Sequence, residues 1–347
     1  MFFDVNSQIL KLIKPNIKEL KAYDPGTINC KIKLDANESP YGFDISLDAI
    51  NIQTNRYPDS KVQGLREFIA ESLDVMPEML LFGNGSDELI FSMILTVGGT
   101  VLCPTPTFSM YSIISRALNE KIITIPLDAN FDLDIDLMLE TCKSSDVKLI
   151  FLSSPNNPTG NSFDRGKILR LINETDAIIV VDEAYQQFSD KESFISLVKN
   201  HERLVVFRTL SKIGLAALRI GFMIASPLLI NEVNKVRLPF NINSLSQGVA
   251  LSILKDDRMG AYIGEIKKAR EYLFNGLAKI KGIKPYPSDA NFILFYVENA
   301  DLIYNKLIAN DILVRNLNSH IKGCLRVTVG TIKENEMFLE VLEKIIV

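Results

Sequence analysis

The middle of the chain contains three apolar runs that each end in polar residues: KLIFLSSPNNPTG at 148–160, AIIVVDEAY at 177–185 and LVVFRTLSK at 204–212. A helix-like stretch at 165–174 separates the first two runs. Strands that are apolar on both faces and are separated by helices predict a parallel sheet covered on both sides. In open sheets of this class the ligand crevice lies beyond the carboxyl ends of the strands. We therefore expect the polar residues at the three strand ends to converge in space.

The rest of the chain is organised around this sheet. The whole chain has 347 residues, of which 47% are hydrophobic, and this is enough for one large core and a smaller one. The last hundred residues have an α+β pattern. A largely helical stretch at 250–277 is followed by a strand at 291–297, a helix at 301–310, a strand at 325–329 and a helix from 333 onward. We predict an α/β fold in three parts: an N-terminal arm at 1–35, a large domain at 36–245 and a small C-terminal domain at 246–347.

Composition excludes several classes of function. The net charge is −4 and no basic stretch occurs, so we expect no nucleic-acid partner. Four cysteines are scattered and only two histidines are present, so we expect reduced thiols and no metal site. No apolar run approaches the roughly 20 residues that span a bilayer, and the first residues lack a signal-peptide pattern. We expect a cytoplasmic protein without a membrane partner.

The polar residues at the strand ends have a coherent chemistry. Lys212 follows the third strand, and a lysine in a dry site beside a cation such as Arg219 becomes a neutral amine nucleophile. Asp182 at the neighbouring strand end could keep a pyridine nitrogen protonated, and Asn157 and Tyr185 could bind a phenolate oxygen. Pyridoxal phosphate needs these partners, because it accepts electrons only while its ring nitrogen is charged.

A phosphate site is also predicted. The turn from Gly83 to Glu88 follows an apolar run at 79–82 and precedes a predicted helix at 89–97. Free amides at a helix N-terminus bind anions. The Gly-x-Gly of this turn is not a dinucleotide fingerprint, because Glu88 stands where the third glycine belongs.

Taken together, these motifs resemble those of the class II aminotransferases of fold type I, and within that class those of the histidinol-phosphate aminotransferases. The resemblance runs from about residue 23 to the end. It rests on segments whose order and spacing agree: 34–38, 55–58, 85–88, 106–111, 156–160, 181–185, 209–212, 218–221 and 324–331. The resemblance implies a large domain with a mostly parallel seven-stranded sheet between helices, a smaller α+β domain and an N-terminal arm.

The resemblance also implies roles for individual residues. Lys212 would hold pyridoxal phosphate covalently and move a proton between the substrate Cα and the cofactor C4′, with Asp182 on the ring nitrogen and Tyr185 on the ring hydroxyl. The same family pattern assigns the cofactor phosphate to Ser86, Asp87, Ser211, Arg219 and Tyr57, the ring hydroxyl also to Asn157, the ring face to Phe108, and a further cofactor contact to Gly85. Relatives often have tyrosine where Phe108 stands, so this chain keeps the stacking ring and loses a hydroxyl.

Substrate recognition is assigned by the same resemblance. Tyr23, Asn37, Arg315 and Arg326 would bind the substrates. A guanidinium can clamp the carboxylate of glutamate or 2-oxoglutarate in one half-reaction and the phosphate of histidinol phosphate in the other. Tyr57 would reach the cofactor phosphate of a neighbouring subunit, which implies a homodimer.

Three alternatives stay open at the level of sequence. An aromatic-amino-acid aminotransferase shares most of these segments. A threonine-phosphate decarboxylase needs the same lysine and aspartate. A non-catalytic cofactor-binding regulator would need an output module, for which the arm at 1–35 is too short.

Overall fold

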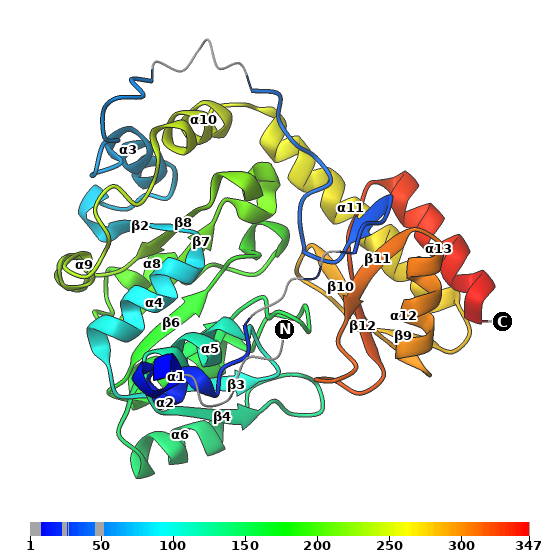
Figure 1. The fold of residues 1–347 in the computed structure, drawn as a ribbon, viewed down its shortest axis with the longest axis horizontal. Helices are drawn as coiled ribbons and strands as arrows, with labels where there is room; N and C mark the ends of the chain where they lie inside the picture. The colour runs from blue at the N-terminus through cyan, green and yellow to red at the C-terminus, as the bar shows by residue number, and fades with distance from the viewer. Residues whose placement is uncertain (1–7, 23–25, 27, 46–51, 347) are drawn as a thin grey trace.

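The computed structural model describes residues 8–22, 26, 28–45 and 52–346 (Figure 1). A seven-stranded sheet forms the centre of the large domain, in the order β2-β8-β7-β6-β5-β3-β4. Strand β8 alone runs in the direction opposite to the other six. Its strands are β2 (Leu80–Asn84), β3 (Thr100–Thr105), β4 (Ile122–Pro126), β5 (Val147–Ser153), β6 (Ile178–Asp182), β7 (Leu204–Thr209) and β8 (Ile220–Ile224). The predicted mostly parallel seven-stranded sheet is confirmed.

Helices cover both faces of this sheet, because successive strand residues point to opposite sides. Phe151 and Val180 belong to a core cluster with residues of α4 (Ser86–Val97), α5 (Met110–Ala117) and α9 (Pro227–Asn234). Their neighbours Ile150 and Val181 belong to a second cluster, on the other face. That cluster includes residues of α3 (Gln63–Ser72), α6 (Ile135–Ser144), α7 (Arg165–Glu174), α8 (Ile195–Val198) and α10 (Ser244–Leu254).

A second sheet lies in the C-terminal part of the chain, in the order β1-β11-β12-β10-β9. Its strands are β1 (Ile32–Leu34), β9 (Ile283–Pro285), β10 (Phe292–Val297), β11 (Ile312–Asn316) and β12 (Cys324–Thr328). Three helices accompany it: α11 (Arg258–Lys279), α12 (Ala300–Ala309) and α13 (Ile332–Ile346). In Figure 1, α12 and α13 lie on the side of this sheet that faces away from the large domain, and α11 extends from α10 toward them. The helical stretch expected at 250–277 is two helices, α10 and α11, separated by residues 255–257.

The N-terminal segment contacts both domains. Helices α1 (Gln8–Leu12) and α2 (Pro15–Lys18) lie beside the large domain, where the Asn16 side chain donates to the carbonyls of Arg116 and Ala117 at 2.8 and 3.1 Å. Further along, β1 pairs in parallel with β11 of the small sheet. Residues 32–34 are therefore an edge strand of that sheet, although they precede the large domain in sequence.

Candidate active site

The three polar strand ends meet at one edge of the large sheet. Register places Ser153 of β5 opposite Asp182 of β6, and Asp182 opposite Phe207 of β7. The chain leaves β7 at Thr209 and turns through residues 211–215, which carry Lys212. The convergence inferred from the apolar runs is therefore observed.

Lys212 is held close to Ala36 and to Tyr185. Its Nζ donates to the carbonyl of Ala36 at 3.3 Å and lies 5.9 Å from the centroid of the Tyr185 ring. Burial lowers the pKa of this lysine to about 8, and the positive charge of Arg326 contributes as the second cause. About a tenth of the amine is therefore neutral at pH 7, far more than for an ordinary lysine, and the neutral form is the one that acts as a nucleophile or proton acceptor.

Asp182 is a buried carboxylate with two fixed donors. The hydroxyl of Tyr111 donates to Oδ2 at 2.8 Å, and the amide of Ala184 donates to Oδ1 at 3.1 Å. Burial raises the pKa of Asp182 to about 6, while both hydrogen bonds oppose that rise. The group is thus charged above this pH and can stabilise a cationic ring nitrogen.

The predicted phosphate site lies where β2 ends and β8 begins. Gly85 has φ +76° and precedes α4, and no side chain among the described residues caps that helix. A Cβ on Gly221 would lie 2.8 Å from the backbone carbon of Gly85 and from the amide nitrogen of Ser86. The Ser86 hydroxyl is buried without a partner among the described residues. Free amides, a spare hydroxyl and two glycines form a cradle with the polarity that an anion needs.

Other predicted phosphate ligands surround this cradle. The Arg219 guanidinium lies against Gly85 and 3.4 Å from the Asp87 carboxylate, and the Arg219 carbonyl accepts from the Gly85 amide at 2.9 Å. Ser211 is buried, and its amide donates to the Thr209 hydroxyl at 3.1 Å. All the predicted phosphate contacts except Tyr57 are therefore near one another in a single chain.

Arg315 of β11 and Arg326 of β12 are directly paired residues on adjacent antiparallel strands of the small sheet. Arg326 is 7% exposed and donates to the side-chain oxygen of Asn157 and to the Asp35 carbonyl, the latter at 2.6 Å. Two guanidinium groups thus lie on adjacent strands, and Arg326 joins the small domain to the Asn157 loop.

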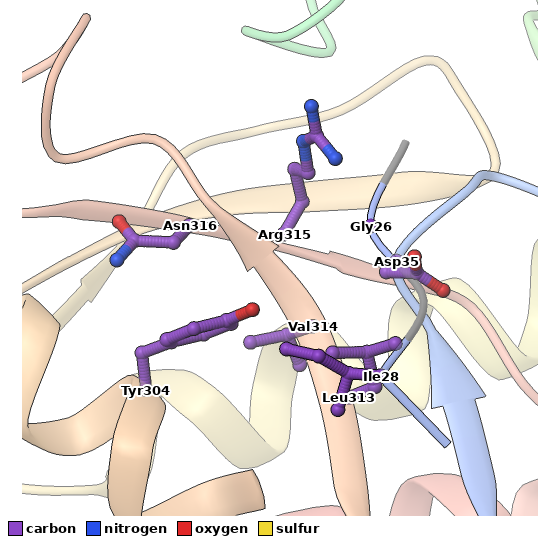
Figure 2. Close-up of a pocket in the computed structure, with 8 residues that line it drawn as sticks. All are labelled: Gly26, Ile28, Asp35, Tyr304, Leu313, Val314, Arg315 and Asn316. Atoms are coloured by element: carbon purple, nitrogen blue, oxygen red, sulfur yellow. The ribbon is translucent and has the colours of Figure 1, made fainter. Parts of the chain in front are cut away.

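A small cavity adjoins Arg315 of β11. It is lined by Gly26, Ile28, Asp35, Tyr304, Leu313, Val314, Arg315 and Asn316 (Figure 2). Figure 2 shows the Arg315 guanidinium extending away from the apolar wall that Leu313 and Val314 form. Tyr23, the other residue expected here, lies outside the described residues.

Asn37 connects three parts of the chain. It is almost fully buried with φ +55°, and its Nδ2 donates to the Tyr185 hydroxyl at 3.0 Å. Its amide donates to the Thr328 hydroxyl at 2.9 Å, and its carbonyl accepts from Asn291 at 3.0 Å. Asn37, expected to contact substrate, is therefore engaged in orienting Tyr185.

Two predicted aromatic contacts have different surroundings. Phe108 packs edge-on against Tyr111, with ring centroids 5.6 Å apart. Tyr57 is 80% exposed and stacks on Phe240 at 4.6 Å. An exposed aromatic pair of this kind is available for contact with another chain.

The structure adds polar groups that sequence reasoning did not single out. Tyr111 lies in the first turn of α5, and Phe108, just before that helix, packs edge-on against its ring. Arg208, inside apolar β7, pairs with Glu183 at 2.8 Å, and both are buried. A lone arginine in a buried strand requires an acidic partner, and Glu183 directly follows Asp182.

Comparison with known proteins places this arrangement in a family. The family model for aminotransferase class I and II matches residues 30–342. A histidinol-phosphate aminotransferase from Aquifex aeolicus is 40% identical over 96% of this chain and 98% of its own length. The chain belongs to the class I and II aminotransferases, in the histidinol-phosphate aminotransferase family.

Solved structures agree with this membership. The histidinol-phosphate aminotransferase from Clostridium acetobutylicum superposes with a TM-score of 0.84 at 25% identity, covering 90% of this chain and 98% of the other. The enzyme from Sinorhizobium meliloti, solved in complex with pyridoxal-5′-phosphate, gives a TM-score of 0.87 at 22% identity, over 96% and 97% of the two chains. The second likeness shows that this aminotransferase has the same fold. Within the described residues, none of its helices combines the length and apolarity needed to cross a bilayer.

Proposed function

We propose that this chain transfers the amino group of L-histidinol phosphate to 2-oxoglutarate, giving imidazole-acetol phosphate and L-glutamate, in histidine biosynthesis. The observation that carries the proposal is the position of Arg326. It contacts the Asn157 loop, and its charge acts on the Lys212 amine, so an anion-binding group adjoins the predicted reaction centre. A substrate that bears a phosphate or a carboxylate a few bonds from its amino group fits that arrangement.

The residues present fit pyridoxal phosphate. The cradle formed by Gly85, Ser86, Gly221 and Arg219 offers amides, a spare hydroxyl and a guanidinium to the phosphate. When bound, this cofactor supplies an aldehyde for the amino group and a charged ring that takes up the electron pair released at the substrate Cα. Asp182, at the end of β6, provides the buried carboxylate that such a ring requires.

The other residues act by orientation and proton transfer. Lys212, whose amine has a lowered pKa, would hold the cofactor through its aldehyde carbon and, once the substrate amine has displaced it, would accept the proton from the substrate Cα and return it to the cofactor C4′. Asn157 has its oxygen bonded to Arg326, so its amide NH₂ remains to donate to the ring hydroxyl, together with Tyr185. Phe108 would stack on the ring. Arg326 and Arg315 hold the phosphate of one substrate and the carboxylate of the other in alternating half-reactions.

We further propose a cytoplasmic homodimer. Tyr57, Phe91, Leu95 and Phe240 expose large apolar side chains, and Phe91 and Leu95 lie on α4, the helix that begins at the phosphate cradle. All four cysteines are free, as is usual in a reducing compartment. If Tyr57 acts across the interface, mixing Lys212→Ala with Tyr57→Ala subunits creates one complete site per heterodimer. Activity should then exceed that of either variant alone, and no gain on mixing would contradict the shared site.

Steady-state assays on three substrates test the reaction. Histidinol phosphate and phenylalanine are each supplied with 2-oxoglutarate, and threonine phosphate is supplied alone to detect decarboxylation. We expect the highest kcat/KM for histidinol phosphate. Good turnover of phenylalanine with negligible turnover of histidinol phosphate would favour an aromatic-amino-acid aminotransferase, and release of CO₂ from threonine phosphate would favour the decarboxylase.

Conservative arginine variants test the anion site. Arg326→Lys keeps the charge but loses the two-pronged contact, so kcat/KM should fall about 10- to 100-fold for histidinol phosphate and glutamate alike. Arg315→Lys should affect the phosphate substrate more than glutamate. Arg170→Lys, at an exposed ion pair on α7, is the matched control and should leave both unchanged. Loss of only one substrate in Arg326→Lys would contradict a site shared by both half-reactions.

A further inference from the structure

Tyr111 is a fully buried tyrosine beside Asp182. It lies on α5 and stacks on Phe151 of β5, with ring centroids 4.8 Å apart and an interplanar angle of 9°. A buried phenol needs a polar partner for its hydroxyl. That partner is Oδ2 of Asp182, at 2.8 Å.

The hydroxyl completes the environment of the carboxylate. Asp182 receives one donor on each oxygen, from Ala184 on its own strand end and from Tyr111 on α5. Two donors on different elements restrict rotation of the carboxylate and favour its charged form. Without the hydroxyl, Oδ2 would lose its donor in a site where burial already raises the pKa of Asp182.

The ring of Tyr111 supports a second cofactor contact. Phe108 meets it edge-on, with an interplanar angle of 86°. Phe108 is the residue expected to stack on the cofactor ring. One side chain therefore contacts both the expected partner of the ring nitrogen and the expected partner of the ring face.

We propose that Tyr111 is a positioning residue for the cofactor: its hydroxyl keeps Asp182 charged and in one orientation, and its ring holds Phe108 in place. The inference rests on the proposed function, since it needs pyridoxal phosphate at this site. With Tyr111 present, the proton shared by Asp182 and the ring nitrogen would reside on the nitrogen; without the hydroxyl, the same proton would move to the Asp182 carboxylate.

The test uses the holoenzyme reconstituted with pyridoxal phosphate labelled with ¹⁵N in its ring. The ¹⁵N chemical shift reports directly whether that nitrogen is protonated. Tyr111→Phe should move the signal from the pyridinium toward the neutral pyridine position and lower kcat about 10- to 100-fold. Ser115→Ala is the matched control: Ser115 is also fully buried on α5 and donates to the Tyr111 carbonyl at 2.7 Å, so it loses a buried hydroxyl away from Asp182.

The outcomes separate this inference from the proposed function. An unchanged ¹⁵N signal in Tyr111→Phe with kcat within twofold of wild type overturns the inference, and so do equal losses in Tyr111→Phe and Ser115→Ala. If Tyr111→Phe does not fold, Tyr111→3-fluorotyrosine keeps the ring and strengthens the donor. Because the wild-type ring nitrogen is already protonated, its signal should stay at the pyridinium position, and a signal that moves toward neutral pyridine in this variant overturns the inference. A wild-type chain that fails to bind the cofactor would instead overturn the proposed function.

Discussion

Gly221→Ala offers a direct test of the phosphate cradle. The new methyl group would lie 2.8 Å from the Gly85 carbonyl carbon and 2.8 Å from the Ser86 amide nitrogen. Both are backbone atoms, so neither can rotate away, and the end of β2 must move relative to β8. Overpacking of this kind costs about 1–3 kcal/mol. If the displacement falls on the free amides of α4, the Kd for pyridoxal phosphate should rise roughly 5- to 150-fold.

The assay is an absorbance titration of the apo-protein with pyridoxal phosphate, accompanied by thermal unfolding of the apo-protein. Gly264→Ala is the matched control, because a Cβ there meets nothing within 4 Å and helix α11 should tolerate or gain from alanine. Cofactor affinity within twofold of wild type in Gly221→Ala would refute the reasoning. A lowered Tm with unchanged affinity would show that the strain is taken up in the core and not at the cradle.

Three further predictions concern buried charges. Glu183→Gln leaves Arg208 buried without a counter-charge, so the free energy of unfolding measured in urea titrations should fall by about 3–5 kcal/mol. The control Glu192→Gln, at an exposed ion pair, should change it by less than about 1 kcal/mol. Asp182 has a folded pKa of about 6 against an ordinary 3.8, so the folded apo-protein binds more protons between these values and loses stability as pH rises through them. Asp182→Asn should lack that loss, and equal pH profiles would contradict the assignment. Lys212 has a folded pKa of about 8 against 10.5, so stability of the apo-protein should rise from pH 8 to 10.5, and Lys212→Met should lack this rise.

The parallel sheet and its functional edge were predictable because the pattern is local. Each of β5, β6 and β7 is a continuous apolar run followed by polar residues, and parallel strands place their carboxyl ends at one edge. Asp182 and Lys212 could therefore be brought together without knowledge of the loops. The helix at 165–174 was also predictable, since Asp164 caps it and apolar residues recur at helical spacing.

Other features depend on contacts between distant parts of the chain. β1 has only three residues, and its partner β11 lies far along the sequence, so no periodicity signals the pairing. The orientation of Asn37 depends on a left-handed backbone and on partners in two other segments. Tyr111 reads as an ordinary aromatic residue at the start of a helix until the sheet brings Asp182 to its hydroxyl. Propensity carries none of this information, because tertiary contacts decide it.

The central claim is that Lys212 carries the cofactor, and one measurement tests it most directly. The holoenzyme is reduced with borohydride, which makes a lysine–cofactor bond permanent, and the digested peptides are mapped by mass spectrometry. We predict a single pyridoxyl-modified lysine, Lys212, with the modification, the visible absorbance and the turnover all lost in Lys212→Ala. A modification on another lysine, or retained turnover in Lys212→Ala, would contradict the account.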